Sequence, residues 1–161
     1  LFFCLKCNIC YHTYMTTFID NRKAHFNYAV EDKYEAGIEL LGFEVKALKA
    51  GMGNLAGAFC VIRGGEAFIV NMHITPYQAG NTPVTYDPDR TRKLLLNRKE
   101  LNELSVIDKA KGLTLIPLSV YSKGRRIKLE IGIAKGKKLH DKRESIKKRD
   151  TDREIRRTLK S

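Results

Sequence analysis

The sequence predicts a mainly β protein, a small β-barrel with a few flanking helices and a basic C-terminal tail that is flexible or helical. Two pairs of segments alternate apolar and polar residues around glycine-containing turns, as β-hairpins do. One longer segment between them has apolar residues at helical spacing. After residue 137 the apolar residues become few and the cations many, which indicates one folded β domain followed by a tail.

The two hairpins are the strongest local prediction. The first spans Ala58 to Ile74 and turns at Gly64-Gly65, a pair that accepts the positive φ angles of a tight turn. The second joins Leu113–Tyr121 to Arg126–Ala134. Its second arm predicts one buried face and one face open to solvent or a ligand, with the apolar positions Ile127, Leu129, Ile131 and Ile133.

Shorter patterns predict the other elements. Alternation over residues 26–30 predicts a strand, and Tyr34 to Leu41 predicts another. Glu44 to Lys49 predicts a short helical turn. Asp87-Pro88 has the character of a helix start, and a helix is expected from there to about Ala110, with an apolar face of Leu94, Leu95, Leu101 and Leu104. Short strands, two hairpins and an intervening helix suit the OB-fold, a five-stranded barrel that often binds oligonucleotides.

The expected organisation has three parts. We interpret residues 1–17 as an atypical N-terminal segment that need not be native, residues 18–137 as the barrel, and residues 138–161 as the basic tail. No apolar run approaches the length of about 18 residues that a membrane span needs. The N-terminal segment also lacks the order of a signal peptide. We therefore expect a cytoplasmic protein with reduced thiols.

Three of the four cysteines lie close together at the N-terminus. Cys4, Cys7 and Cys10 have a C-x2-C-x2-C spacing that could serve an iron–sulfur or zinc site. A fourth ligand is not evident nearby, although the side chain of His12 or Cys60 is chemically able to bind a metal. We expect no metal site and no cofactor.

The charge of the chain points to a polyanionic partner. The formal net charge is +12, with 30 Lys and Arg against 18 Asp and Glu. Residues 135–161 hold 12 of these cations and 5 of the anions, a net of +7, so more than half the excess lies in the last 27 residues. Neutralising nucleic-acid phosphates releases condensed counterions, which favours RNA as the partner.

Two other kinds of protein share some of these features, a nuclease and a generic RNA-binding protein. A nuclease needs clustered carboxylates, whereas Asp87 and Asp89 are interpreted as helix capping, so we expect no enzymatic activity. A generic single-strand RNA-binding or ribosomal OB-fold protein is the alternative. Such a protein is expected to interleave aromatic residues on its binding strands, and the polar positions of strand 126–134 carry none.

Eight short stretches resemble one family and keep its order from about Asn21 to the C-terminus. The family is that of the SsrA-binding proteins, also called small protein B or SmpB. The stretches are Asn21-Arg22-Lys23-Ala24, Tyr34-Glu35-Ala36-Gly37, Gly42-Phe43-Glu44-Val45-Lys46, Gly65-Glu66-Ala67-Phe68, Ile74-Thr75-Pro76, Asp87-Pro88-Asp89-Arg90-Thr91-Arg92-Lys93-Leu94-Leu95-Leu96, Gly132-Ile133-Ala134-Lys135-Gly136-Lys137-Lys138 and His140-Asp141-Lys142-Arg143.

The resemblance implies an OB-type barrel that binds the tRNA-like domain of transfer-messenger RNA. It implies delivery of that RNA to stalled ribosomes for trans-translation, which rescues the ribosome and tags the nascent peptide. The tail is expected to enter the decoding centre and the mRNA channel of the small subunit. Elongation factor Tu would be an indirect partner, through the RNA, and the protein is expected to be a monomer.

The resemblance also implies two sets of site residues. On the barrel the RNA-binding set is Asn21, Arg22, Lys23, Tyr28, Glu35, Lys46, Leu95 and Lys128. In the tail the ribosome-binding set is Lys135, Lys137, Lys138, His140, Asp141, Lys142, Arg143, Ile146, Lys147 and Arg149.

Each barrel residue also has an ordinary structural interpretation. Lys128 lies on the polar face of the clearest strand, where it could equally be a solvated lysine. Tyr28 could stack on a base or pack against the sheet, and Leu95 could pack on RNA or in the core. Glu35 would repel phosphate, so in an RNA site it should accept from a base amino group, a 2′-OH or an adjacent basic side chain.

Overall fold

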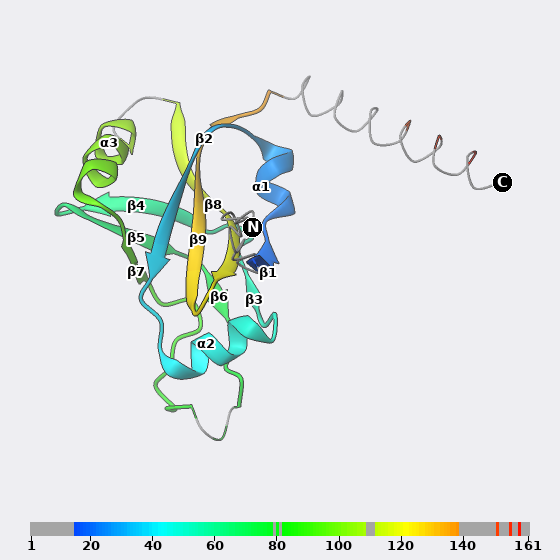
Figure 1. The fold of residues 1–161 in the computed structure, drawn as a ribbon, viewed down its shortest axis with the longest axis vertical. Helices are drawn as coiled ribbons and strands as arrows, with labels where there is room; N and C mark the ends of the chain where they lie inside the picture. Colours follow the sequence, from blue (N-terminus) through cyan, green and yellow to red (C-terminus); the bar gives the residue numbers. More distant parts are fainter. Residues whose placement is uncertain are drawn as a thin grey trace, which may run out of the picture.

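A seven-stranded antiparallel sheet forms the centre of the structure, which is a computed structural model that describes residues 15–78, 80, 82–108, 112–138, 151, 155 and 158. The strand order is β1-β8-β9-β2-β7-β5-β4. The edge strand β4 also contacts β8, so the sheet curls on itself (Figure 1). The strands are β1 (Met15–Asp20), β2 (Tyr28–Ile38), β4 (Phe59–Arg63), β5 (Glu66–Val70), β7 (Arg92–Leu95), β8 (Leu113–Lys123) and β9 (Arg126–Gly136).

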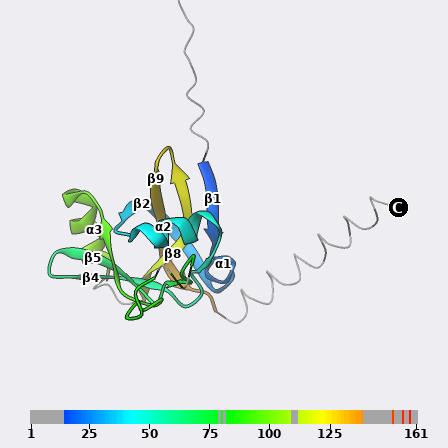
Figure 2. The ribbon, with the colours of Figure 1, turned by 90° about the horizontal axis from the view of Figure 1, so that it is seen from below.

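Three helices and a two-stranded sheet flank this barrel. Helix α1 (Arg22–Asn27) packs against β2 and β8, and α3 (Arg98–Asp108) packs against β4 and β8 (Figures 1 and 2). Helix α2 (Gly42–Lys49) follows β2 and contacts β1 and β6. The small sheet pairs β3 (Gly53–Asn54) with β6 (His73–Ile74). The predicted class, a mainly β barrel with a few helices, is confirmed, with seven paired strands in the main sheet in place of five.

The predicted hairpins set the core. Gly64 and Gly65 take φ angles of +60° and +76° in the β4–β5 turn, and Gly124 takes +62° in the β8–β9 turn. Along β9 the apolar positions Leu129, Ile131 and Ile133 are buried, as the alternation predicted. They pack with buried residues of the other strands into one continuous core, which includes the free thiol of Cys60.

Two predicted elements are wrong at their boundaries. Residues 22–27 form helix α1, where a strand was expected from residue 26, because Asn21 caps the helix by accepting from the backbone N–H of Ala24 at 3.0 Å. The helix expected from Asp87 begins only at Arg98. Residues 92–95 instead form β7, which pairs with β2 and β5 and buries Leu94. The main sheet also includes Met15 to Thr17, which precede the expected start of the barrel at residue 18.

A buried ion cluster fastens α2 to β7. The Glu44 carboxylate is fully buried and accepts from the Arg92 guanidinium at 2.8 Å and from the Arg90 guanidinium at 2.6 Å. The Tyr86 hydroxyl donates to it at 3.1 Å. Burial alone would raise the pKa of Glu44, but the hydrogen bonds from Arg90 and the Leu41 N–H, with the charge of Arg92, lower it to about 2. The cluster thus fixes where the chain enters β7.

In the part of the chain that the structure describes, every helix is too short or too polar to span a lipid bilayer.

This cluster predicts acid-sensitive stability. The pKa of Glu44 falls from 4.5 to about 2 on folding, so its contribution is present above pH 4.5 and is lost as the pH falls toward 2. The wild type should lose about 3 kcal/mol over that window through this group. Glu44→Gln should lower the free energy of unfolding at pH 7 by about 3–5 kcal/mol, because it leaves two guanidiniums without their anion. Urea unfolding followed by circular dichroism at pH 7 and pH 3 measures both effects.

Glu66→Gln is the matched control, because Glu66 pairs with Lys93 on the protein surface. Its stability should change little at either pH. If the difference between wild type and Glu44→Gln is the same at pH 7 and pH 3, the assignment to Glu44 is wrong.

Candidate nucleic-acid interface

One row of outward-facing residues crosses four neighbouring strands. Gly37 of β2 pairs with Leu95 of β7 on one side and with Lys128 of β9 on the other. Lys128 in turn pairs with Tyr121 of β8. Residues directly opposite one another in an antiparallel sheet lie on the same face. Register therefore assembles Leu95, Lys128 and Tyr121 on one face of the sheet, although they are far apart in the sequence and Tyr121 is largely covered there.

A groove of about 450 Å³ lies along this row. Its apolar walls come from β2, the loop that follows it, α2, β7 and β9, and its cations come from the β8–β9 turn and from β9. We call it the Leu95 groove, and it is lined by Gly37, Ile38, Leu40, Val45, Leu95, Arg125, Arg126, Ile127 and Lys128. Apolar walls beside three cations suit a nucleotide, which combines an apolar base face with a phosphate.

Gly37 and Leu95 shape the groove. Leu95 is 56% exposed. A Cβ on Gly37 would lie 3.2 Å from the Leu95 Cβ, which is tighter than ordinary contact. Glycine at this position therefore lets the leucine approach β2 closely, and the exposed leucine faces the groove.

The Glu35 carboxylate is held by three donors at the side of the same row. The Tyr121 hydroxyl donates to Oε2 at 2.6 Å. The Lys123 ammonium donates to Oε2 at 2.9 Å and to Oε1 at 3.2 Å, and the Lys128 ammonium lies 3.4 Å from Oε1. The bonds from Tyr121 and then Lys123 lower the pKa of Glu35 to about 2, so the carboxylate is ionised at neutral pH.

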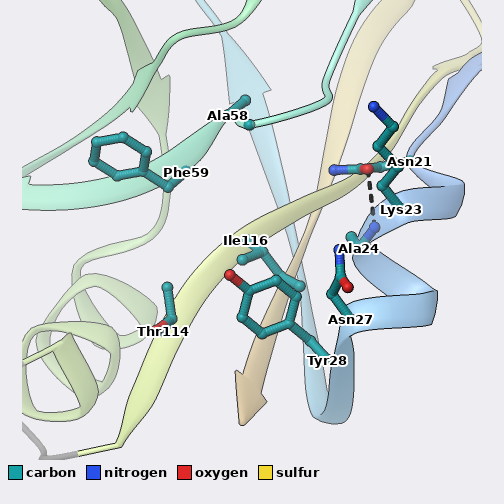
Figure 3. A pocket seen from close by; sticks show the side chains of 10 residues that line it. Asn21, Lys23, Ala24, Asn27, Tyr28, Ala58, Phe59, Thr114 and Ile116 are labelled. Carbon is teal, nitrogen blue, oxygen red and sulfur yellow. Dashed lines mark hydrogen bonds between the residues drawn. The ribbon is translucent and has the colours of Figure 1, made fainter. Parts of the chain in front are cut away.

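A second pocket, of about 320 Å³, lies at the other end of β2 beside α1 (Figure 3). Tyr28 packs against the small apolar cluster that contains Ile116, and Phe59 stands across the pocket from it. Lys23 and Asn27 of α1 also line it. From Tyr28 to Gly37 is nine residues of strand, about 30 Å, so one nucleotide cannot reach both sites.

Asn21 differs from the rest of the predicted RNA-binding set because its side chain is buried and hydrogen-bonded within the protein. It is 6% exposed, and its side-chain oxygen accepts from the Ala24 N–H. Its side-chain nitrogen donates to the backbone carbonyls of Leu55 and Pro117 at 3.1 and 2.9 Å. The amide is therefore engaged within the protein, where it positions α1 and with it Lys23.

The remaining predicted residues are distributed over the surface. The Arg22 side chain is 93% exposed near Asp20, and Lys46 is exposed on α2 next to the groove residue Val45. Lys135 is the second-to-last residue of β9, and the Lys137 ammonium donates to the backbone carbonyl of His25 in α1 at 3.1 Å. Lys138 is exposed. The other predicted tail residues lie outside the described residues: His140, Asp141, Lys142, Arg143, Ile146, Lys147 and Arg149.

Of the residues that line the groove, only Leu95 and Lys128 belong to the set predicted from the sequence, and Lys123 beside Glu35 was also missed. Lys123 and Arg125 lie in the turn between the two arms of the second predicted hairpin. Their nearness to Glu35 and Leu95, however, depends on pairing between strands that are distant in sequence. Within the described ranges no three His, Cys, Asp or Glu side chains gather as a metal site, and Cys4, Cys7 and Cys10 fall outside those ranges.

Comparison with known proteins identifies the family. Residues 18–161 match the family model of the SmpB protein. The SsrA-binding protein of Gloeothece citriformis is 52% identical over 141 residues, which cover 88% of this chain and 91% of the relative. That of Burkholderia lata is 51% identical over 143 residues, which cover 89% and 97%.

A solved structure is also similar. It is described as "tmRNA-SmpB: a journey to the center of the bacterial ribosome", and one of its chains is 42% identical to this chain with a TM-score of 0.64. The match covers 75% of this chain and 85% of that one. Since the sequence matches extend over most of the molecule at about 50% identity, this chain belongs to the SmpB protein family.

Proposed function

We propose that this protein binds the tRNA-like domain of transfer-messenger RNA through the Leu95 groove and delivers that RNA to stalled ribosomes for trans-translation. The observation that carries the proposal is the groove itself, an apolar wall with an exposed leucine and three cations in a chain of the SmpB family. Relatives at about half identity are named SsrA-binding proteins, and the similar solved structure is described as SmpB with tmRNA on the bacterial ribosome.

The groove favours a folded RNA over a plain single strand. Proteins that bind single strands without sequence preference stack successive bases on aromatic side chains. The walls of the Leu95 groove are aliphatic, and its polar edge is cationic. Such a surface can hold an unstacked base of a loop together with neighbouring phosphates, which are features of a folded, tRNA-like RNA.

The second pocket extends the proposed footprint to the α1 end of the barrel. Tyr28 offers a ring for stacking, and the exposed cations Arg22 and Lys23 lie on the adjacent helix. We assign Asn21 an indirect part in binding, because its amide orders α1. Lys46 adds positive charge beside the groove.

The tail is proposed to reach the small-subunit decoding centre and the mRNA channel. This part of the proposal rests on the sequence from Lys135 onward, whose net charge is +7. Elongation factor Tu would take part through the RNA. We expect the protein to act as a monomeric binding protein, without catalysis, in the cytoplasm, because that is where ribosomes translate.

Co-purification tests the proposal as a whole. The tagged full chain, expressed in a bacterial host and purified at moderate salt, should carry one strongly enriched RNA, the host transfer-messenger RNA. RNA sequencing against the total cellular pool measures the enrichment. A mixed RNA population would instead support a generic RNA-binding OB protein, and metal-dependent cleavage of the RNA would support a nuclease.

Lys128→Ala should weaken binding to the transcribed tRNA-like domain and flatten its salt dependence. One phosphate contact contributes about 0.7–0.9 to the slope of log K against log salt. Filter binding or fluorescence anisotropy over a range of salt concentrations measures that slope. Lys99→Ala, a change at an exposed lysine on α3, is the control and should leave the slope unchanged. A wild-type slope for Lys128→Ala excludes Lys128 as a phosphate contact.

Deleting residues 141–161 should spare binding to the isolated RNA and abolish peptide tagging on stalled ribosomes. The reason is that the groove and the α1 pocket lie wholly within residues 21–128. A reconstituted translation system with a message that lacks a stop codon measures tagging, and anisotropy measures RNA affinity. Equal loss of both activities would contradict separate roles for the barrel and the tail.

A further inference from the structure

We propose that Lys123 is a further RNA-contacting residue beside the Leu95 groove, and that Glu35, with Tyr121, is a positioning residue for Lys123 and Lys128 and does not contact the RNA itself. The inference rests on the proposed function, because it concerns how the same surface holds the RNA. The sequence allowed Glu35 to contact a base directly, whereas the structure favours an indirect role for this carboxylate.

The lone pairs of Glu35 are already used within the protein. A carboxylate has about four lone-pair directions on its two oxygens. Tyr121 and Lys123 donate to Oε2 at 2.6 and 2.9 Å, and Lys123 also donates to Oε1 at 3.2 Å. The Lys128 ammonium is 3.4 Å from Oε1. A base amino group could bind Glu35 only by displacing one of these donors.

The sheet brings Lys123 to this place from a distant strand. Lys123 is the last residue of β8 and pairs with Arg126 of β9. Glu35 lies one strand further on, in β2. The Lys123 side chain therefore reaches across β9 to Glu35. Its side chain is 49% exposed, and an ammonium has three N–H donors, so a donor remains for a phosphate oxygen.

Tyr121 holds the Glu35 carboxylate in one orientation. Its residue is 8% exposed, so the ring is fixed by packing. Its hydroxyl gives Glu35 its shortest hydrogen bond, 2.6 Å. A carboxylate that is held on one side by a fixed hydroxyl presents its remaining lone pairs to the two lysines in one orientation. The lysines are ordered before RNA arrives, which removes part of the entropic cost of ordering them on binding.

The local charge is consistent with this assignment. Lys123 and Lys128 contact Glu35, and Arg125 and Arg126 line the groove beside Lys128. Glu130, which pairs with Glu35 across the two strands, is balanced by Lys33 at 3.3 Å, so these groups together carry a net of +3. An unpaired carboxylate at this place would repel phosphate. A carboxylate that is neutralised by two lysines keeps the surface attractive to RNA and fixes where the positive charge lies.

A double-mutant comparison separates the indirect role from a direct contact. Binding of the full chain to the transcribed tRNA-like domain is measured by anisotropy at several salt concentrations. Glu35→Gln alone should weaken binding. In a background that carries Lys123→Met and Lys128→Met, Glu35→Gln should cause no further loss, because the residues it positions are gone. An equal loss in both backgrounds would show that Glu35 contacts the RNA and would overturn the proposal.

Lys123→Met tests the new contact. It should weaken binding about five- to eightfold at 0.1 M salt and flatten the salt slope by about 0.7–0.9, whereas Lys99→Met on α3 should change neither. Lys123→Arg should restore most of the slope, because the charge is kept. Tyr121→Phe should weaken binding less than Lys123→Met and leave the slope nearly unchanged. An unchanged slope for Lys123→Met overturns the assignment.

Two controls keep the result interpretable. Urea midpoints near that of the wild type show that the variants fold, as expected for a partly exposed ion pair. The wild type must also enrich transfer-messenger RNA in the co-purification. Failure there would overturn the proposed function, whereas wild-type binding with an unaffected Lys123→Met would overturn only the inference about Lys123.

Discussion

The register of β2 is the constraint on which the rest of the structure depends. This strand pairs with β9 along most of its length and with β7 at its C-terminal end. Ala36 and its partner Leu129 face the core, while Gly37 and its partner Lys128 face outward. Because side chains alternate along a strand, a shift by one residue would exchange the two faces. The same pairing therefore buries the core and builds the groove.

The buried ion cluster supports this register from outside the sheet. Glu44 lies in α2, directly after β2, and Arg92 is the first residue of β7. Their 2.8 Å contact ties the segment that follows β2 to the strand that pairs with it. A buried ion pair adds little to stability compared with apolar packing, but it penalises any arrangement that separates its partners. Here that penalty falls on displacements of β7, and with them on displacements of Leu95.

The parts of the fold that could be predicted from sequence are those governed by local rules. Gly64-Gly65 and the alternation of residues 126–134 each specify a hairpin without reference to the rest of the chain. Strand β7 could not be found in this way. Its four residues lie in a run of apolar and basic residues that also fits a helix, and only pairing with β2 and β5 decides between them. Helix α1 was missed because the alternation of residues 26–30 favoured a strand, and its cap, Asn21, is held in place by carbonyls 34 and 96 residues away.

The residues of the candidate site also fall into those that local sequence rules could predict and those that they could not. Lys128 could be placed on an outward face from the period of its own strand, and Leu95 and Glu35 could be selected because they lie in motifs of the family. The partners of Glu35 could not be derived, since Tyr121 and Lys123 meet it only after β9 has been inserted between β8 and β2. The role of Glu35 also changes once its neighbours are known, from a potential contact with a base to an anchor for two lysines.

The division of charge between barrel and tail indicates which part can select an RNA. Residues 135–161 carry a net charge of +7. Affinity that comes from many phosphate contacts is strong and depends steeply on salt, but it hardly distinguishes one RNA sequence from another. The groove has fewer cations, but Glu35 and Tyr121 fix two of them beside an aliphatic wall. A few charges in fixed positions bind tightly only to an RNA whose phosphates and unstacked base match the spacing of those charges and the wall. Discrimination must therefore come from the barrel, because added tail cations would raise the affinity for every RNA alike.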